Sequence, residues 1–155
     1  MTDAQGLLTV CSDGASRGNP GPAGIGGRAV GPGGEVVAEV CEYLGVTTNN
    51  VAEYMALILI LESVAPLGYE KVRVLTDSVL VAEQVKGGFK VKSPALKPLV
   101  GKAKGLLERY REVEVTHVPR EKNTECDLLA NRAVDEGLAG TKKPLLEEVE
   151  DSRLF

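Results

Sequence analysis

Three strand-like segments come before the first helical pattern in this chain, and this order restricts the possible fold more than any other feature. Residues 7–12, 23–30 and 35–44 combine apolar and β-branched residues and are separated by Gly-rich turns. Helical and strand patterns then alternate: a helix over 50–65, a strand over 71–76, helices over 78–86 and 95–110, a strand over 112–118 and a helix over 124–137. This order predicts an α/β domain with a mixed sheet.

The length and composition are typical of a single soluble domain. A chain of 155 residues can bury a sizeable core, and a hydrophobic content of 43% is ordinary for a globular protein. The most apolar segment, residues 51–68, contains Glu53 and Glu62, so we interpret it as a buried helix and expect no membrane span. We assign residues 1–137 to the domain. Residues 138–155 have no clear periodicity, and we expect them to form a loosely ordered tail.

The N-terminal sequence and the cysteines favour a cytoplasmic location. The first residues, "MTDAQGLL", lack the basic and apolar regions of a secretory signal. The cysteines are odd in number, lie far apart and lack zinc-ligand spacing: Cys11, Cys41 and Cys126. We therefore expect a reducing compartment, no disulfide framework and, by default, a monomer.

The net charge of −4 conceals an uneven distribution of charge along the chain. Residues 1–83 contain ten acidic and four basic residues, whereas residues 84–107 contain six lysines and no acid. We call residues 84–107 the basic segment. An acidic body beside a basic segment suits a protein that binds a metal in one place and a polyanion in another. A solvated lysine face on a helix would explain the same charges.

Four carboxylates stand at positions that favour chemistry: Asp13, Glu53, Asp77 and Asp127. Asp13 and Asp77 end predicted strands, which is where sites form in open α/β sheets. Glu53 and Asp127 share helical stripes with apolar residues. A carboxylate that faces a core is unfavourable unless it is paired or binds a cation.

Each of these acids also has a purely local alternative. Asp13 is an acceptable turn residue, and Asp77 precedes a predicted helix, where it would serve as the N-cap. Glu53 and Asp127 would complete capping boxes with Asn50 and Thr124, respectively. The sequence alone leaves these alternatives open.

Several common enzyme classes are disfavoured by what the sequence lacks. The loop over residues 14–24 has no Gly-Lys-Ser/Thr ending of a phosphate-binding loop, and "GIGG" leads into a strand where a dinucleotide fingerprint would lead into a helix. His117 is the only histidine, and no Ser or Cys stands in a nucleophile elbow. A nucleotide cofactor and a catalytic triad are therefore not expected.

Four segments together resemble the type 1 ribonuclease H family: "SDGASRGNPGPAG" (12–24), "TTNNVAEYMAL" (47–57), "LTDSVLVAEQV" (75–85) and "VPREKNTECDLLANRA" (118–133). They occur in the family's order and at its spacing, span about residues 6–137, and each contains one of the four acids. The resemblance implies the ribonuclease H-like fold, a five-stranded mixed sheet in the order 3-2-1-4-5 with helices on both faces.

The resemblance also implies a mechanism. Asp13, Glu53, Asp77 and Asp127 are expected to converge as catalytic carboxylates that bind two Mg²⁺ ions, with Mn²⁺ as a possible substitute. Carboxylates suit Mg²⁺, which prefers oxygen ligands. Two such ions can clamp an in-line displacement at phosphorus. The implied substrate is the RNA strand of an RNA–DNA hybrid, cleaved to 5′-phosphate and 3′-hydroxyl ends.

Further matches imply contacts with the hybrid. Asn19, Asn49 and Asn50 match positions that contact the minor groove and the RNA 2′-hydroxyls, and Thr48 matches a position that holds a DNA phosphate. Gly14 begins the Gly-Asn-Pro loop, whose backbone is expected to approach the nucleic acid. As an alternative, Asn19 and Asn49 are simply turn-forming residues.

The sequence departs from the family pattern in two places. The basic protrusion of many members is absent, as in one branch of the family. We hypothesise that the six lysines of the basic segment, among them Lys90, Lys92 and Lys97, supply the phosphate contacts. The mobile catalytic histidine of many members has no clear equivalent. His117 has a compatible spacing, but it continues a strand pattern, so we interpret it as structural.

We thus expect a metal-dependent ribonuclease H that acts on RNA–DNA hybrids. The alternatives are a catalytically silent hybrid- or RNA-binding module on the same fold, and a structure-specific DNase of the wider superfamily. Retention of all four acids argues against the silent module, and the "GNPG" and "TTNN" segments argue for RNA-containing substrates.

Overall fold

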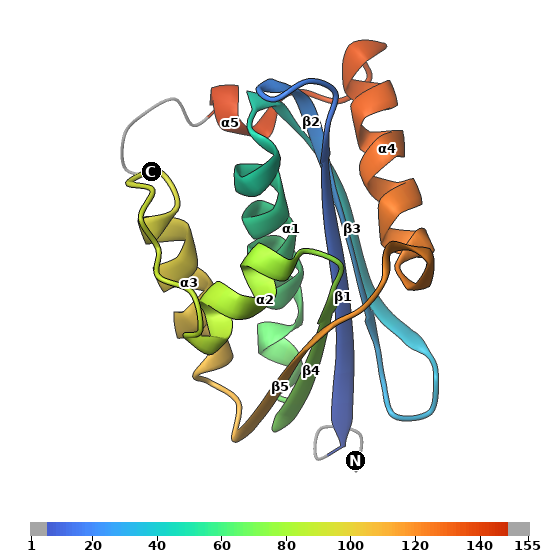
Figure 1. Cartoon of the computed structure of the whole chain (residues 1–155). Helices are drawn as coiled ribbons and strands as arrows, with labels where there is room; N and C mark the ends of the chain where they lie inside the picture. The colour runs from blue at the N-terminus through green and yellow to red at the C-terminus, as the bar shows by residue number, and fades with distance from the viewer. Residues whose placement is uncertain (1–5, 149–155) are drawn as a thin grey trace.

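A computed structural model describes residues 6–148 of the chain. Its five strands form one mixed sheet in the order β3-β2-β1-β4-β5, as predicted (Figure 1). The strands are β1 (Leu7–Ser16), β2 (Gly21–Val30), β3 (Val36–Thr47), β4 (Lys71–Thr76) and β5 (Glu112–His117). β1, β2 and β3 form the antiparallel meander, whereas β1, β4 and β5 run parallel.

Helices cover both faces of this sheet, as the resemblance implied. They are α1 (Asn49–Val64), α2 (Val79–Lys86), α3 (Lys97–Leu107), α4 (Thr124–Leu138) and α5 (Leu145–Glu148), with short 3₁₀ turns at Ala65–Leu67 and Arg120–Lys122. Figure 1 shows α4 on one side of the sheet and α1, α2 and α3 on the other. α1 contacts β1, β2 and β3 with one face and α3 with another, so it is the central helix of the domain.

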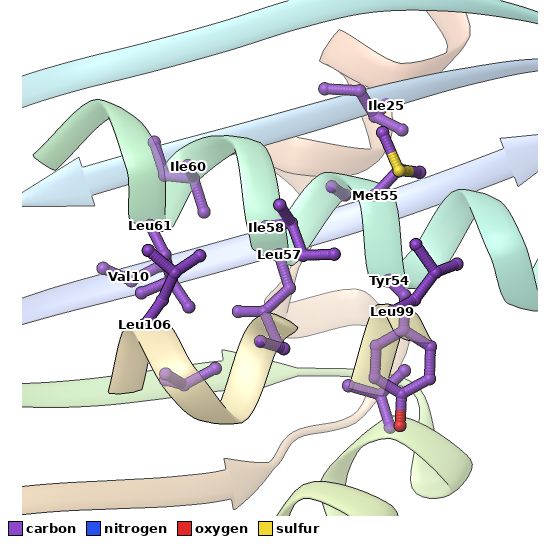
Figure 2. Close-up of a cluster of buried hydrophobic side chains, with 14 of the residues drawn as sticks. Val10, Ile25, Tyr54, Met55, Leu57, Ile58, Ile60, Leu61, Leu99 and Leu106 are labelled. Carbon is purple, nitrogen blue, oxygen red and sulfur yellow. The ribbon is translucent and has the colours of Figure 1, made fainter. Parts of the chain in front are cut away.

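The core explains why the apolar run in α1 has no clear polar face. Figure 2 shows side chains of α1, among them Leu57 and Leu61, packed between the sheet residue Val10 and Leu106 of α3. Leu57 and Leu61 are each 1% exposed. The segment Asn49–Leu67 is long and apolar enough to cross a bilayer, but burial on two sides within the domain accounts for its composition. Truncating a leucine at such a site typically costs about 2–5 kcal/mol of stability.

The segment after α4 was expected to be a loosely ordered tail. Part of it is helical: α5 begins at Leu145, and Leu145 and Leu146 are partly buried against the core. Residues 149–155 lie outside the described residues. The division into residues 1–137 and 138–155 stays a prediction.

Candidate active site

Asp13 lies inside β1 and not at its end, so this part of the prediction is wrong. β1 continues to Ser16 because β2 pairs with it antiparallel as far as the Ser16–Ala23 pair, and Asp13 is opposite Gly26. On its other side, β4 ends at Thr76, which pairs with Ser12. Asp13 therefore lies just beyond the carboxyl end of the neighbouring parallel strand, which is the edge where sites form in α/β sheets. Its side chain is buried.

Glu53 projects from α1 toward Asp13 and does not close a capping box. The N-cap of α1 is Thr48, whose hydroxyl accepts a hydrogen bond from the Val51 amide at 3.3 Å. The Glu53 Oε1 atom instead accepts a hydrogen bond from the Gly14 amide at 3.1 Å. Glu53 is only 6% exposed, so the tertiary structure, and not the helix end, fixes this carboxylate.

A glycine at position 14 permits this close approach of α1 to β1. A Cβ atom at Gly14 would lie 2.3 Å from the Ala52 carbonyl carbon and 2.5 Å from the Glu53 amide nitrogen. Both neighbours are backbone atoms and cannot rotate away. Any side chain at this position would push α1, and the Glu53 carboxylate with it, away from Asp13.

Asp77 follows β4 directly and is half-buried. It is not the N-cap of α2, because Ser78 takes that position and accepts a hydrogen bond from the Val81 amide at 3.1 Å. The Asp77 Oδ2 atom accepts a hydrogen bond from Asn123 Nδ2 at 3.3 Å. The local alternative is therefore wrong for Asp77 as well, and its carboxylate contacts a residue from a distant part of the chain.

Asp127 enters the site from the other face of the sheet, in the first turn of α4. The N-cap of α4 is Asn123, and Thr124 makes no capping box with Asp127. The side chain of Asp127 lies close enough to Asp13 to contribute to the raised pKa of Asp13. Its Oδ1 atom also accepts a hydrogen bond from Asn131 Nδ2 at 3.3 Å, one turn further along the helix.

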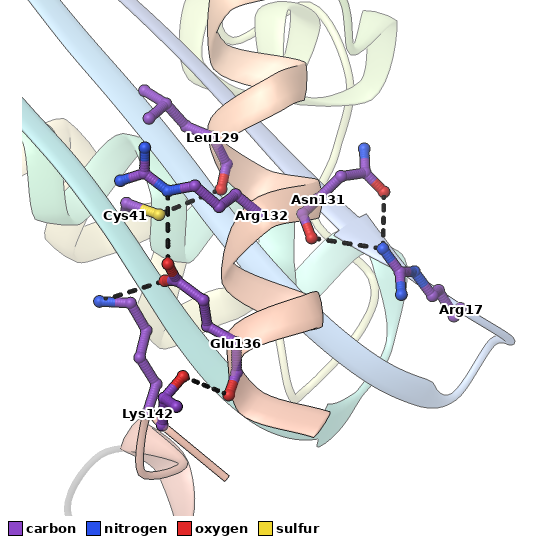
Figure 3. Close-up of polar contacts among 8 residues, drawn as sticks. Arg17, Cys41, Leu129, Asn131, Arg132, Glu136 and Lys142 are labelled. Atoms are coloured by element: carbon purple, nitrogen blue, oxygen red, sulfur yellow. Dashed lines mark hydrogen bonds and ion pairs between the residues drawn. The ribbon is translucent and has the colours of Figure 1, made fainter. Parts of the chain in front are cut away.

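Polar contacts hold α4 against the sheet and so determine the position of the Asp127 side chain (Figure 3). Arg17, just beyond β1, donates hydrogen bonds to the carbonyl oxygen and side chain of Asn131. It also forms an ion pair with Asp135 at 2.8 Å. The Cys41 thiol donates a hydrogen bond to the Leu129 carbonyl oxygen at 3.2 Å. These contacts join α4 to the meander at several points along its length.

Three of the four acids come close enough to share one cation. One carboxylate oxygen each from Asp13, Glu53 and Asp77 lies within 4.8 Å of the others. Burial, followed by the charges of Glu53 and Asp77, raises the pKa of Asp13 to about 9. Burial and the charge of Asp77 raise the pKa of Glu53 to about 8, although the Gly14 amide and the charge of Arg120 act in the opposite direction. A cation bound here would relieve this repulsion.

The donor set fits a hard divalent cation. All the converging ligand atoms are carboxylate oxygens, which suit Mg²⁺ or Mn²⁺ better than zinc or copper. The two cysteines behind the site do not join this set: the Cys11 and Cys126 sulfurs are 2.9 Å from each other, and both thiols are free.

The residues predicted to bind substrate gather in a second place, at the N-terminus of α1. Asn19, Thr48 and Asn50 line a pocket of about 480 Å³, together with Ser93 and Leu96. The Asn19 Oδ1 atom accepts a hydrogen bond from the Asn49 amide at 2.9 Å, which ties the loop after β1 to the start of α1. The structure therefore brings all four of these predicted residues together.

Lys90 and Lys92 lie on an irregular stretch between α2 and α3, and both are exposed. Within residues 6–148, no acidic side chain forms an ion pair with Lys90, Lys92 or Lys97. The stretch is nevertheless anchored: the Tyr54 hydroxyl donates to Gln84 Oε1 at 2.7 Å, and Gln84 Nε2 donates to the Lys90 carbonyl oxygen at 3.3 Å. The backbone is thus held while the lysine side chains point into solvent.

His117 is the last residue of β5 and is exposed. It pairs in register with Thr76, the residue before Asp77. The predicted strand position is confirmed, whereas the absence of a catalytic role stays a prediction.

Known proteins are similar to this chain in both sequence and fold. The family model described as "Reverse transcriptase-like" matches residues 11–133. Ribonuclease HI of Halobacterium salinarum is 42% identical over 134 residues, which cover 86% of this chain and 67% of that protein. The chain belongs to the ribonuclease HI family. This confirms the resemblance drawn from the four motifs and the expected class of enzyme.

Relatives of this family differ in length and in how much of the protein the matching region covers. The bifunctional protein Rv2228c of Mycobacterium tuberculosis is 46% identical over 129 residues, but the chain spans only 35% of its length. Among solved structures, LC11-RNase H1 in complex with an RNA/DNA hybrid has a TM-score of 0.79 and 42% identity, over 84% of this chain and 99% of that one. The ribonuclease H fold predicted from the sequence is confirmed.

Asn123 is the residue at this site that sequence reasoning missed. It is 2% exposed and bonds directly to Asp77. The sequence pattern gave the capping position to Thr124, and no local pattern at Asn123 indicates its contacts with β1 and Asp77.

Proposed function

We propose that this chain is a metal-dependent endoribonuclease that hydrolyses the RNA strand of RNA–DNA hybrids. The observation that carries the proposal is the convergence of Asp13, Glu53 and Asp77 from three separate segments of the chain to within 4.8 Å. Such a cluster of buried acids destabilises a folded chain unless a cation binds to it. The hybrid in the structure of LC11-RNase H1, a relative with 42% identity, supports the choice of substrate.

Asp13, Glu53, Asp77 and, beside Asp13, Asp127 would hold the metal. Two Mg²⁺ ions about 4 Å apart would supply an activated water and stabilise the leaving 3′-oxygen, which gives 5′-phosphate and 3′-hydroxyl ends. We propose that Mn²⁺ substitutes, because it accepts the same oxygen ligands. The protein contributes rigid positions for the four carboxylates: β1 and α1 hold two of them through the hydrogen bond between Glu53 and Gly14.

We propose that the hybrid lies across the site and the pocket at the N-terminus of α1. Asn19, Asn49 and Asn50 would contact bases and 2′-hydroxyls, Thr48 would hold a DNA phosphate, and the Gly14 backbone would border the path of the RNA. The free ammonium groups of Lys90 and Lys92 would contact phosphates further along the duplex. Ser93 and Leu96 of the same pocket connect these two regions. We further propose that the protein acts as a monomer in the cytoplasm.

Cleavage of a labelled hybrid in Mg²⁺ tests this function. The substrates are an RNA–DNA hybrid, single-stranded RNA, double-stranded RNA and duplex DNA, and the enzymes are the wild type and Asp13→Asn. The Asn side chain keeps the shape but lacks the charge that holds metal. We expect hybrid cleavage by the wild type and its loss in the variant. A folded wild type that binds the hybrid but cleaves nothing in Mg²⁺ or Mn²⁺ would instead indicate a silent binding module, and preferred cleavage of duplex DNA would indicate a DNase.

A further inference from the structure

Asn123 contacts three of the segments that carry the candidate acids. Its Nδ2 atom donates hydrogen bonds to the Ser12 carbonyl oxygen at 2.9 Å and to Asp77 Oδ2 at 3.3 Å. The backbone carbonyl oxygen of Asn123 accepts a hydrogen bond from the Asp127 amide at 3.1 Å, the first bond of helix α4. Since Ser12 is the neighbour of Asp13 in β1, one residue joins β1, the end of β4 and the start of α4.

The orientation of the Asn123 amide is fixed by these contacts. An amide nitrogen has two N–H groups, and both point at acceptors of the site. A flipped amide would place Oδ1 against two acceptors, which is unfavourable. In the present orientation, Oδ1 is buried and has no hydrogen-bond partner within residues 6–148. An unpaired buried oxygen lowers stability, so fold stability alone does not explain this side chain.

Within residues 6–148, the bond from Asn123 is the one side-chain hydrogen bond that the Asp77 carboxylate makes. Asp77 lies between the last residue of β4 and the N-cap of α2, and its side chain is only half-buried. Asp13 and Glu53, in contrast, are 4% and 6% exposed and are enclosed by the sheet and α1. The bond from Asn123 is therefore the contact that sets the direction of the Asp77 carboxylate toward the other two.

We propose that Asn123 is a positioning residue: it orients the Asp77 carboxylate and fixes the start of α4 against β1. The four acids are then held together in their metal-binding arrangement. This inference rests on the proposed metal-dependent function. It assigns a role in cation binding to a residue that offers no ligand of its own to the cluster.

The test is the binding of Mn²⁺ and Mg²⁺ to the substrate-free protein, measured by titration calorimetry for the wild type and for Asn123→Ala. We expect metal affinity to fall by about 10–100-fold, the usual effect of removing a partner that orients a metal ligand. Raising the Mg²⁺ concentration should restore much of the lost hybrid cleavage, since the four acids are still present. The expected change thus lies in the metal dependence and less in the rate at saturating metal.

Thr141→Ala is the matched control. The Thr141 hydroxyl donates to the Glu136 carbonyl oxygen at 3.0 Å, so this variant removes a side-chain hydrogen bond at the opposite end of α4. It should lower the unfolding temperature slightly and leave metal affinity unchanged. If Asn123→Ala likewise changes only the unfolding temperature, the role of Asn123 is purely structural and the proposal is wrong.

Two further measurements separate the possible failures. If Asn123→Ala does not fold, Asn123→Ser retains one side-chain donor, and metal affinity intermediate between the wild type and Asp13→Asn is expected. Wild-type affinity in Asn123→Ser would contradict the proposal. If the wild type itself binds no more metal than Asp13→Asn, it is the proposed metal-dependent function that fails, independently of Asn123.

Discussion

The acidic cluster and the basic segment are held in opposite ways. Asp13 and Glu53 are buried on regular elements, and a backbone amide of one element bonds to the carboxylate of the other. Lys90 and Lys92 are exposed on an irregular stretch of which only the backbone is anchored. Cation chemistry requires ligands placed within a few tenths of an ångström, whereas attraction to phosphates requires only charge within reach.

This difference indicates how strongly a substitution at each residue should affect activity. A site that depends on exact placement fails when one member moves, whereas a diffuse charged surface loses strength in small steps. Substitutions among the acids should therefore have large effects, and substitutions in the basic segment should have small ones.

Glu53→Gln should abolish activity and at the same time stabilise the metal-free protein. The amide keeps an oxygen for the Gly14 amide but removes a charge that is repelled by Asp77. We expect hybrid cleavage to fall by at least about a hundredfold, while the unfolding temperature in EDTA at alkaline pH rises. Glu62→Gln, on the same helix but paired with exposed Lys102, is the control and should change neither. A wild-type level of cleavage in Glu53→Gln would remove Glu53 from the site.

Gly14→Ala should damage the site through the backbone alone. The added methyl group meets the Ala52 and Glu53 backbone, so we expect a loss of about 1–3 kcal/mol of stability and a large loss of cleavage. Gly101→Ala in α3 is the matched control, because a Cβ atom there meets nothing within 4 Å. It should raise stability by about 0.5–1 kcal/mol. Chemical denaturation measures both changes, and equal effects of the two variants would contradict the close contact described for position 14.

The metal-free domain should lose stability as the pH rises. The pKa of Asp13 is raised from 3.8 to about 9 by burial and the charges of Glu53 and Asp77, and that of Glu53 from 4.5 to about 8 by burial and the charge of Asp77. Between these limits the folded state holds protons that the unfolded state has released, so the free energy of unfolding falls with increasing pH. Thermal unfolding in EDTA should show this slope, and saturating Mg²⁺ or Glu53→Gln should reduce it. A pH-independent unfolding temperature in EDTA would show that the pKa values of Asp13 and Glu53 are not raised in the folded protein.

Substitutions in the basic segment should have the smallest and most graded effect. Replacing Lys90, Lys92 and Lys97 by Ala should weaken hybrid binding and make the plot of log affinity against log salt less steep by about one unit for each lost phosphate contact. The rate at saturating hybrid should change little. Lys102→Ala is the control, because Lys102 already pairs with Glu62 at 3.0 Å. Unchanged affinity and salt slope would show that the hybrid does not reach this segment.

The order of helices and strands and the identity of the four acids could be predicted from the amino-acid sequence. Apolar periodicity is a local property, so the strand at Lys71–Thr76 and the helix from Thr124 were predicted nearly to the residue. Each of the four family motifs is also a short continuous segment, and each contains one of the four acids. The capping boxes considered as alternatives for Glu53 and Asp127 are absent from the structure for the same reason: local spacing cannot show whether a carboxylate bonds to its own helix or to a distant segment.

Only the tertiary structure decided what each of these side chains contacts. The partner of Glu53 is the amide of Gly14, 39 residues away, and the partner of Asp77 is Asn123, 46 residues away. Antiparallel pairing with β2 also extended β1 beyond Asp13, which placed the carboxylate inside a strand. The physical reason is burial: once β1, α1 and α4 pack together, a polar group loses water and must take the partner that packing brings to it.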